Sequence, residues 1–211
     1  MIEPQIRSDV PVTGVKLVTA YNYLSQKNNI NPYTRILDRS TQCAISTYCM
    51  EILNQKDKTR NPKFNTLNHQ TIEHDYYLAV DNYIKNTPAK DTRFQSDVHR
   101  SVVNSWLTFA GLTKRFQHSV VSVNKIKALI DLDISVALGT NITTFLKGAS
   151  GHFQDAVGYC DQGLISNDPY GWAHNGYKDD KGKLVLYTWA EVDRLFTPFS
   201  PKFPCLMSWI E

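Results

Sequence analysis

The sequence predicts an α+β fold in which a run of helices comes first and an antiparallel sheet follows. Two observations carry this prediction. Apolar side chains recur at helical spacing between residues 43 and 130, whereas from residue 134 on short apolar stretches are separated by turn residues. Strands and helices therefore do not alternate along the chain, which argues against a parallel sheet built from strand-helix-strand units.

The chain opens with a loosely alternating stretch, Gly14–Leu24, which predicts a strand. The polar stretch Ser25–Arg39 predicts a long loop. Ser40, Thr41 and Gln42 then offer the start of a helix, because Ser and Thr side chains are good helix N-caps. We expect this helix to carry the residues from position 43 to position 53.

Lys56–Asn68 is polar and predicts a second connection. Helical spacing of apolar residues follows it and predicts two helices of several turns, His69–Lys85 and Asp97–Leu112, and a short one, Val123–Ile130. The remainder is expected to be mostly strand, with a helical turn at Trp189–Phe196. The expected strands are Ile134–Gly139, His152–Tyr159, Leu164–Ser166, Leu184–Tyr187 and Cys205–Ile210.

Length and composition limit the classes of protein. The 211 residues are 42% hydrophobic and 20% charged, which suits a soluble globular protein, and we expect a single domain over residues 1–211. The net charge of +3 includes no dense basic tract, so no nucleic-acid partner is expected. No apolar window is long enough for a membrane helix, and no secretion signal opens the chain, so we expect synthesis in the cytoplasm without membrane insertion.

Cys43, His152 and Asp168 together predict a nucleophilic triad. A free thiol titrates near ~8.5, and both a helix N-terminus and a neighbouring imidazole favour its thiolate. Cys43 stands at the head of a predicted helix, where it would receive the first of these effects. Taken alone it would be interpreted as a buried structural cysteine. The histidine and the acid downstream favour a catalytic role instead.

The acid that orients His152 is either Asp168 or its neighbour Asn167, because adjacent side chains of a strand face opposite sides. We favour Asp168. A simple three-residue turn after Cys160 would oppose Asp168 to Ala156, leaving it about 13 Å along the strand from His152. The triad therefore requires a different register, or a bulge at Gly158.

Acyl transfer also requires donors for the oxyanion of the tetrahedral intermediate. The backbone N–H of Cys43 is one, because helix N-termini leave such groups unpaired. Gln26, in the loop before the nucleophile, is the preferred side-chain donor, ahead of Asn29 and Gln42. The four cysteines and six histidines show no metal-binding spacing, so neither a metal nor another cofactor is expected.

Cysteine first, histidine later and acid last is the chain order of papain-type cysteine hydrolases. Several motifs resemble the bacteriocin-processing peptidase-like branch of the papain superfamily. They are Tyr23-Leu24-Ser25-Gln26-Lys27-Asn28-Asn29, Cys43-Ala44-Ile45-Ser46-Thr47, Gly151-His152 through Val157-Gly158-Tyr159, Gly163-Leu164-Ile165, Asn167-Asp168-Pro169-Tyr170-Gly171 and Leu186-Tyr187-Thr188-Trp189-Ala190-Glu191-Val192. They lie within residues 23–47 and 151–192 of the chain, with weaker agreement between.

The resemblance implies a papain-like fold, with Cys43 as nucleophile, His152 as general base, Asp168 as its orienting acid and Gln26 as oxyanion donor. It implies a cysteine hydrolase that cleaves peptide or amide bonds through a thioester. Compact members of this kind resemble phage or bacterial cell-wall hydrolases, so we expect a peptidoglycan stem-peptide or cross-bridge endopeptidase, as in an endolysin. The alternatives are a non-catalytic envelope- or peptide-binding module, a leader-peptide-processing peptidase, and an acyl transferase.

Overall fold

A computed structural model describes residues 4–29, 42–64, 67, 71–87, 95–149, 151–198 and 204–211. The helices are α1 (Cys43–Thr59), α2 (Ile72–Lys85), α3 (Ser96–Phe109), α4 (Val123–Asp131) and α5 (Trp189–Leu195), with 3₁₀ turns η1 (Gln26–Asn28), η2 (Pro62–Phe64) and η3 (Ala173–Asn175). The strands are β1 (Lys16–Leu17), β2 (Phe116–Val120), β3 (Val136–Asn141), β4 (Gly151–Tyr159), β5 (Gly163–Asn167), β6 (Val185–Thr188) and β7 (Leu206–Ile210).

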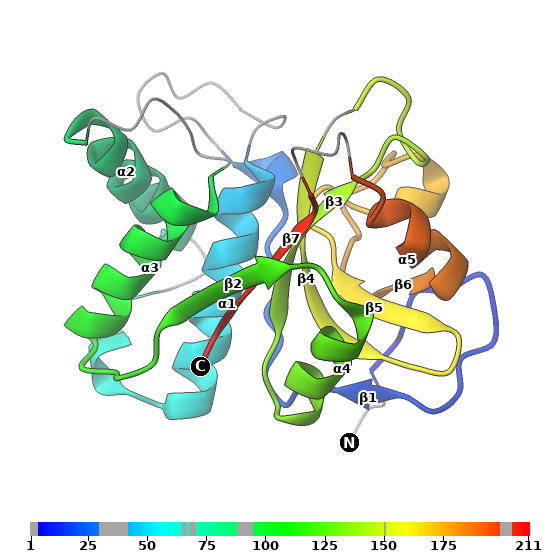
Figure 1. The fold of residues 1–211 in the computed structure, drawn as a ribbon, viewed down its shortest axis with the longest axis horizontal. Coiled ribbons are helices and arrows are strands. Elements are labelled where there is room, and N and C mark those ends of the chain that lie inside the picture. Colours follow the sequence, from blue (N-terminus) through cyan, green and yellow to red (C-terminus); the bar gives the residue numbers. More distant parts are fainter. Residues whose placement is uncertain are drawn as a thin grey trace.

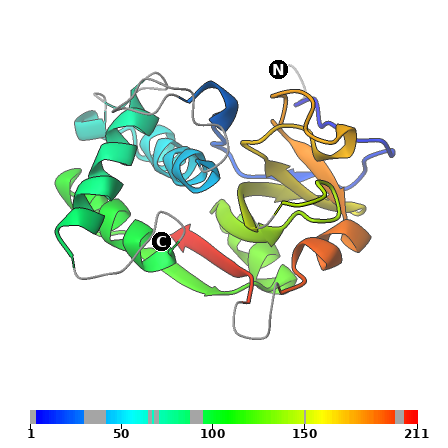
Figure 2. The ribbon, with the colours of Figure 1, turned by 90° about the horizontal axis from the view of Figure 1, so that it is seen from above.

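One antiparallel sheet organises these elements, with the strand order β2-β7-β3-β4-β5-β6. The short strand β1 pairs with the end of β4, beyond the stretch that pairs with β3. Helices α1, α2 and α3 gather on one side of the molecule, and α4 and α5 lie on the other beside most of the sheet (Figures 1 and 2). The segregated α+β fold expected from the sequence is thereby confirmed.

Two apolar cores hold the structure together. One joins α1, α2 and α3, and the other fills the space between the sheet, α4 and α5. Strand β3 serves both, since Leu138 lies in the sheet core while its neighbour Ala137 lies in the helical core. Side chains alternate across a strand, so a central strand covered on both faces is largely buried, as β3 is from Val136 to Leu138.

Helix α1 runs through the middle of the molecule and is buried from Cys43 to Gln55. It contacts α2 and α3 on one side and β4 on the other. The helix ends where Arg60 adopts a left-handed conformation, with φ of 50°, and donates its N–H to the Lys56 carbonyl. This central position brings the start of α1 to the same layer as the strand that carries His152.

Most of the predicted elements are present, but three predictions were wrong. The strand expected at Gly14–Leu24 shrinks to two residues, because only Lys16 and Leu17 find partners on β4. The connection expected from Lys56 begins later, because α1 continues to Thr59. Strand β2 was missed: it is an edge strand with a polar, largely exposed sequence, so its apolar pattern is weak.

The predicted helix start and long loop fall partly outside the described residues. Ser40 and Thr41 are not among them, and the residue that precedes α1 is Gln42. All four cysteines are free and buried. None of the helices in the described ranges combines the length and the apolar character needed to cross a membrane.

Candidate active site

Cys43 is the first residue of α1, with its side chain almost buried at 4% exposure. The helix opens with the N–H of Ser46 donating to the carbonyl of Gln42 at 3.0 Å. The N–H groups of the first turn have no intrahelical partner, and the helix dipole places partial positive charge there. The chain therefore places the Cys43 side chain beside the unpaired N–H groups of the first turn of α1.

The β4–β5 hairpin decides how close the acid comes to the imidazole. The hairpin turns tightly, with the N–H of Cys160 donating to the carbonyl of Gly163 at 2.9 Å, so the three-residue turn considered in the sequence analysis does not form. The register then shifts by one residue between Ala156 and Gly158. This bulge lies beside the position at which the sequence required one.

The combined effect of the turn and the bulge is to slide Asp168 toward His152. Asp155 pairs with Asn167, so continuing the register places Asp168 opposite Gln154 rather than opposite Ala156. Gln154 and His152 share one face of β4, because side chains alternate along a strand. Asp168 and His152 thus become diagonal neighbours, a separation that long side chains span.

The His152 and Asp168 side chains meet directly. His152 Nε2 lies 2.7 Å from Asp168 Oδ1, and the two side chains are only 4% and 0% exposed. Asn167, the alternative to Asp168 as the partner of His152, makes its hydrogen bonds to other residues. Its amide donates to the Asn22 carbonyl at 2.7 Å, and its Oδ1 accepts the Leu184 N–H at 2.9 Å. The structure therefore joins Asp168, and not Asn167, to the histidine.

The Asp168 carboxylate receives donors on both oxygens. Its Oδ1 also accepts the N–H of Tyr170 at 2.9 Å. Its Oδ2 accepts the hydroxyl of Tyr187 at 2.5 Å and that of Tyr177 at 3.2 Å. These partners and the His152 ring give the buried carboxyl group four hydrogen-bond partners, which a buried polar group needs. Sequence reasoning missed both tyrosines, although Tyr187 stands in one of the resembling motifs.

His152 interacts with both the Asp168 carboxyl group and the Cys43 thiol. Burial alone lowers the pKa of His152, but the charge and hydrogen bond of Asp168, and a hydrogen bond with Cys43, outweigh it and raise the pKa to about 10. Because Nε2 is taken by Asp168, the Nδ1 nitrogen remains for the sulfur. The imidazole is thus held between a carboxylate and a thiol, and its raised pKa favours the protonated form.

The backbone of Asp168 is fixed as well as its side chain. Its N–H donates to the carbonyl of Gly182 at 2.7 Å. A Cβ atom on Gly182 would come within 1.8 Å of the Asp168 carbonyl oxygen, so only glycine fits there. Gly182 is therefore a second residue that positions the acid and that sequence reasoning did not identify.

Gln26 lies beside this constellation, in η1, and is buried at 2% exposure. Its backbone N–H donates to the carbonyl of Pro169, which directly follows Asp168, and η1 also contacts α1. The rival donor Asn29 is committed elsewhere, since its amide donates to Ser46 and Glu73. The other rival, Gln42, is buried next to Cys43, and its Nε2 has no partner among the described residues.

Two aromatic rings lie near the imidazole. The ring centroids of Tyr170 and Tyr177 are each 6.1 Å from that of His152. Lys27, the neighbour of Gln26, donates its ammonium group to the carbonyls of Tyr177 and Asp179. The segment that carries Tyr177 is thus anchored to the segment that carries Gln26.

The arrangement fits nucleophilic chemistry by a thiol. Within the described residues, no group of three or more His, Cys, Asp or Glu side chains is placed to hold a metal ion. What the chain brings together is a helix-head thiol, a buried imidazole and a fully hydrogen-bonded carboxylate. Together these are the parts of a general-base-activated nucleophile.

Comparison with known proteins adds evidence on the fold. No protein-family model matches the sequence, and no curated protein is significantly similar to it. Among solved structures, a crystal structure from Bacillus anthracis, described as a C39-like peptidase, superposes with a TM-score of 0.55. The alignment covers 93% of this chain and 98% of that chain at 9% sequence identity. At that identity the likeness concerns the fold, and the chain accordingly adopts a papain-like α+β fold.

Proposed function

We propose that the protein is a cysteine hydrolase that cleaves peptide bonds through a thioester, with Cys43, His152 and Asp168 as its catalytic triad. One observation carries this proposal: the imidazole of His152 is bound by Asp168 at 2.7 Å on one nitrogen and interacts with the Cys43 thiol. The arrangement has the roles of a nucleophile, a base and an orienting acid.

In the acylation step the Cys43 thiolate attacks the carbonyl carbon of the peptide, forming the sulfur–carbon bond. The tetrahedral intermediate collapses when the carbon–nitrogen bond breaks and His152 delivers its proton to the leaving amine. Water then attacks the thioester, with neutral His152 accepting its proton. The sulfur leaves as thiolate, the acid product departs, and the protonated imidazole is restored.

The oxyanion of each tetrahedral intermediate needs preorganised donors. The N–H of Cys43 is one, because it belongs to the unpaired first turn of α1. We assign the second to the Gln26 side chain, which lies buried beside Pro169 and next to α1. The Asn29 amide already donates to Ser46 and Glu73, so we favour Gln26 over Asn29 as the oxyanion donor.

For the substrate we propose the stem or cross-bridge peptides of peptidoglycan. Support comes from the motifs around Gln26, Cys43, His152 and Asp168, which resemble the bacteriocin-processing peptidase-like branch, whose compact members resemble phage and bacterial cell-wall hydrolases.

The test is digestion of purified cell walls, with mass spectrometry of the released fragments. Wild type should release peptide fragments with new amino termini, and Cys43→Ala should release none. Cys49→Ala is the matched control. Cys49 lies six residues further along α1, is buried, donates to the Ile72 carbonyl and has a pKa raised by burial. Its loss should leave cleavage intact.

Two outcomes would contradict the proposal. Cleavage that survives Cys43→Ala would exclude a cysteine nucleophile. Wall binding by wild type without any thiol-dependent release of fragments would identify a binding module on the same fold. Alkylation with iodoacetamide at pH 6 supplies an independent measurement, because an activated thiol reacts well below the ordinary titration range of cysteine.

A further inference from the structure

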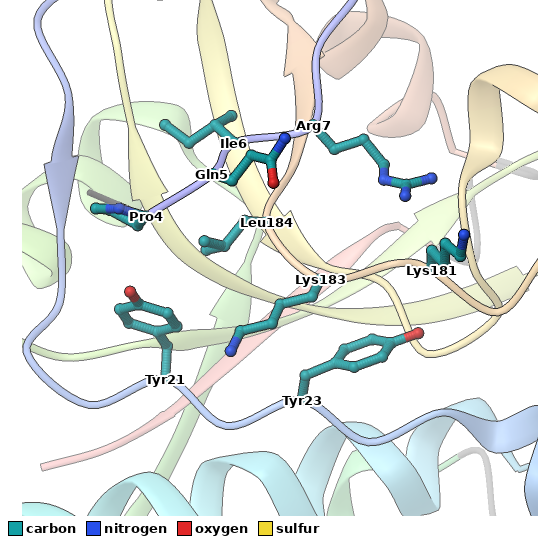
Figure 3. A pocket seen from close by; sticks show the side chains of 9 residues that line it. All are labelled: Pro4, Gln5, Ile6, Arg7, Tyr21, Tyr23, Lys181, Lys183 and Leu184. Atoms are coloured by element: carbon teal, nitrogen blue, oxygen red, sulfur yellow. The ribbon is translucent and has the colours of Figure 1, made fainter. Parts of the chain in front are cut away.

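A concave region involves the segment that leads from Asp168 to β6. It is a cavity of about 510 Å³ between the N-terminal segment, the segment before η1 and the segment before β6. Figure 3 shows the side chains around it. Its lining residues are Pro4, Gln5, Ile6, Arg7, Tyr21, Tyr23, Lys181, Lys183 and Leu184. The volume is that of a site for a ligand larger than a single ion.

The charge of this pocket has one sign. Three of the nine lining residues are cationic, Arg7, Lys181 and Lys183, and none is acidic. Arg7 is partly neutralised by Asp179, whose carboxylate lies 3.3 Å from it. No carboxylate in the described part of the chain pairs with the ammonium groups of Lys181 and Lys183. The pocket therefore offers two cations that remain available to an anion.

The walls of the pocket are aromatic and aliphatic. The ammonium of Lys183 lies 5.6 Å from the ring centroid of Tyr21, and its side chain extends between the rings of Tyr21 and Tyr23 (Figure 3). Ile6 and Leu184 add apolar surface. Apolar walls with a few placed cations suit a peptide that carries acidic side chains beside an apolar or aromatic one.

One wall of the pocket also positions the catalytic acid. The hydroxyl of Tyr23 donates to the Asp180 carbonyl and accepts the Gly182 N–H. The carbonyl of the same Gly182 accepts the N–H of Asp168 at 2.7 Å. A ligand bound by Lys181 and Lys183 would therefore contact the same segment that hydrogen-bonds the backbone of Asp168.

We propose that this pocket is an exosite that binds an acidic segment of the peptide substrate. The inference builds on the hydrolase function proposed above and narrows its substrate to peptides with carboxylate side chains outside the scissile bond. Exposed lysines contribute modestly one by one, so two of them acting together should give a preference of about tenfold.

The experiment is calorimetric titration of the Cys43→Ala variant, which cannot cleave its ligand, with acetyl-Glu-Tyr-Glu amide and with acetyl-Gln-Tyr-Gln amide. The glutamate peptide should bind about tenfold more tightly, and the difference should shrink as salt is added. Adding Lys181→Ala and Lys183→Ala should abolish the preference. Adding Lys63→Ala and Lys147→Ala, two exposed lysines outside the pocket, gives the same change in net charge and should preserve it.

Equal affinities for the two peptides would overturn the proposal, and so would loss of the preference in the Lys63 and Lys147 control. Displacement of the glutamate peptide by inorganic phosphate at equal or lower concentration would show a phosphate site instead. The wall-digestion assay separates this result from the parent proposal. If cleavage depends on Cys43 but the peptides bind without preference, only the exosite proposal is wrong. If the glutamate peptide binds selectively but cell walls are not cleaved, only the hydrolase proposal is wrong.

Discussion

Two buried aspartates of the β4–β5 hairpin have opposite surroundings. Asp168 and Asp155 are both 0% exposed. Asp168 faces only donors, namely an imidazole, a backbone N–H and two tyrosine hydroxyls. Asp155 faces another acid, because its carboxyl group shares a hydrogen bond with Glu51 of α1, and it receives one amide donor from Asn54 at 3.2 Å.

The surroundings set the charge that each site carries. Burial raises the pKa of Asp155, and the charge and hydrogen bond of Glu51 raise it further. Burial raises the pKa of Glu51 as well. The Ser135 hydroxyl and the charge of Lys58 lower the pKa of Glu51, but burial outweighs them, which favours a proton held between the two carboxyl groups. At the other site, Asp168 raises the pKa of His152 and keeps the imidazole protonated.

The comparison teaches that burial alone does not assign a function to an acid. The same residue type at the same depth binds an imidazole where donors converge, and has a raised pKa where another carboxyl group faces it. In the function we propose, the first arrangement moves a proton to and from a substrate, whereas the second joins α1 to β4. Substitutions that remove the charge without changing the shape should therefore affect the two sites in opposite directions.

The largest effect is expected from the paired substitutions Asp168→Asn and Asp155→Asn. In Asp168→Asn an NH₂ group meets hydrogen-bond donors and the imidazolium loses its counter-charge. Unfolding free energy should fall by about 2–3 kcal/mol, and kcat by about 10- to 100-fold. In Asp155→Asn the NH₂ group can donate to Glu51 in place of the shared proton. Stability should stay within about 0.5 kcal/mol of wild type or rise.

Urea unfolding and the wall-digestion assay measure these two effects. Equal destabilisation by both substitutions would break the comparison, since it would mean that the two carboxyl groups have the same ionisation state. NMR titration of His152 adds a readout that a purely structural role would not move. Its pKa should fall from about 10 in Asp168→Asn and remain there in Asp155→Asn.

The next effect concerns the backbone that holds Asp168. Gly182→Ala would place a Cβ atom 1.8 Å from the Asp168 carbonyl oxygen, so the segment must shift. We expect a loss of about 1–3 kcal/mol, with kcat lowered as the acid moves. Gly139→Ala is the control, because the nearest atom to its Cβ is 3.4 Å away. Similar losses in both variants, measured by urea unfolding, would show that close packing at Gly182 has no special role.

The sequence predicts those features of the two aspartate sites that depend on neighbouring residues in the chain, but not those that depend on contacts between distant segments. The positions of Cys43, His152 and Asp168 follow from local patterns, namely a helix start and the ends of two strands. The bulge between Ala156 and Gly158 could be stated only as a requirement, because it depends on how β1 and β5 crowd Gly158 from both sides.

The partners of the two aspartates were not predictable in the same way. Tyr187 reaches Asp168 from the neighbouring strand β6, and Glu51 reaches Asp155 from α1. The residues of each pair are too far apart in the chain for helical or strand periodicity to indicate the contact. Tyrosine is also common in cores as a packing residue, so its hydroxyl gives no indication of a role until the fold brings it to an acid.

A smaller effect is expected from Tyr187→Phe. This change removes one of two hydroxyls from Asp168 Oδ2 and leaves Tyr177, so unfolding free energy should fall by about 1–2 kcal/mol. We expect kcat to fall while KM stays constant, because Tyr187 acts through Asp168. Tyr159→Phe removes a hydroxyl that donates to Asp131 at an exposed site and should cost almost nothing. An equal loss of unfolding free energy in the two variants would show that burial does not strengthen the contribution of the Tyr187 hydroxyl.

The smallest effect is a change in the pH dependence of stability. Glu51 and Asp155 have pKa values raised by folding, so between them the folded state binds more protons than the unfolded state above about pH 4. Their contribution to stability therefore falls as pH rises from about 4. The His152 contribution is also lost with rising pH, but only from about pH 6.5 toward its folded pKa of about 10. Between pH 4.5 and 6.5 the acid pair can thus be observed separately.

Glu51→Gln should remove that slope. Its amide can donate to Asp155 without a titrating proton, so the variant should gain about 1 kcal/mol relative to wild type between pH 4.5 and 6.5. Urea unfolding at several pH values across this window gives the difference, in which the other carboxyl groups cancel. Glu191→Gln is unsuitable as a control, because Glu191 closes a capping box with Thr188. Asp9→Asn, at an exposed position, serves instead and should leave the slope unchanged. A slope that persists in Glu51→Gln would mean that Glu51 is not its source, and the contrast with Asp168 would then rest on catalysis alone.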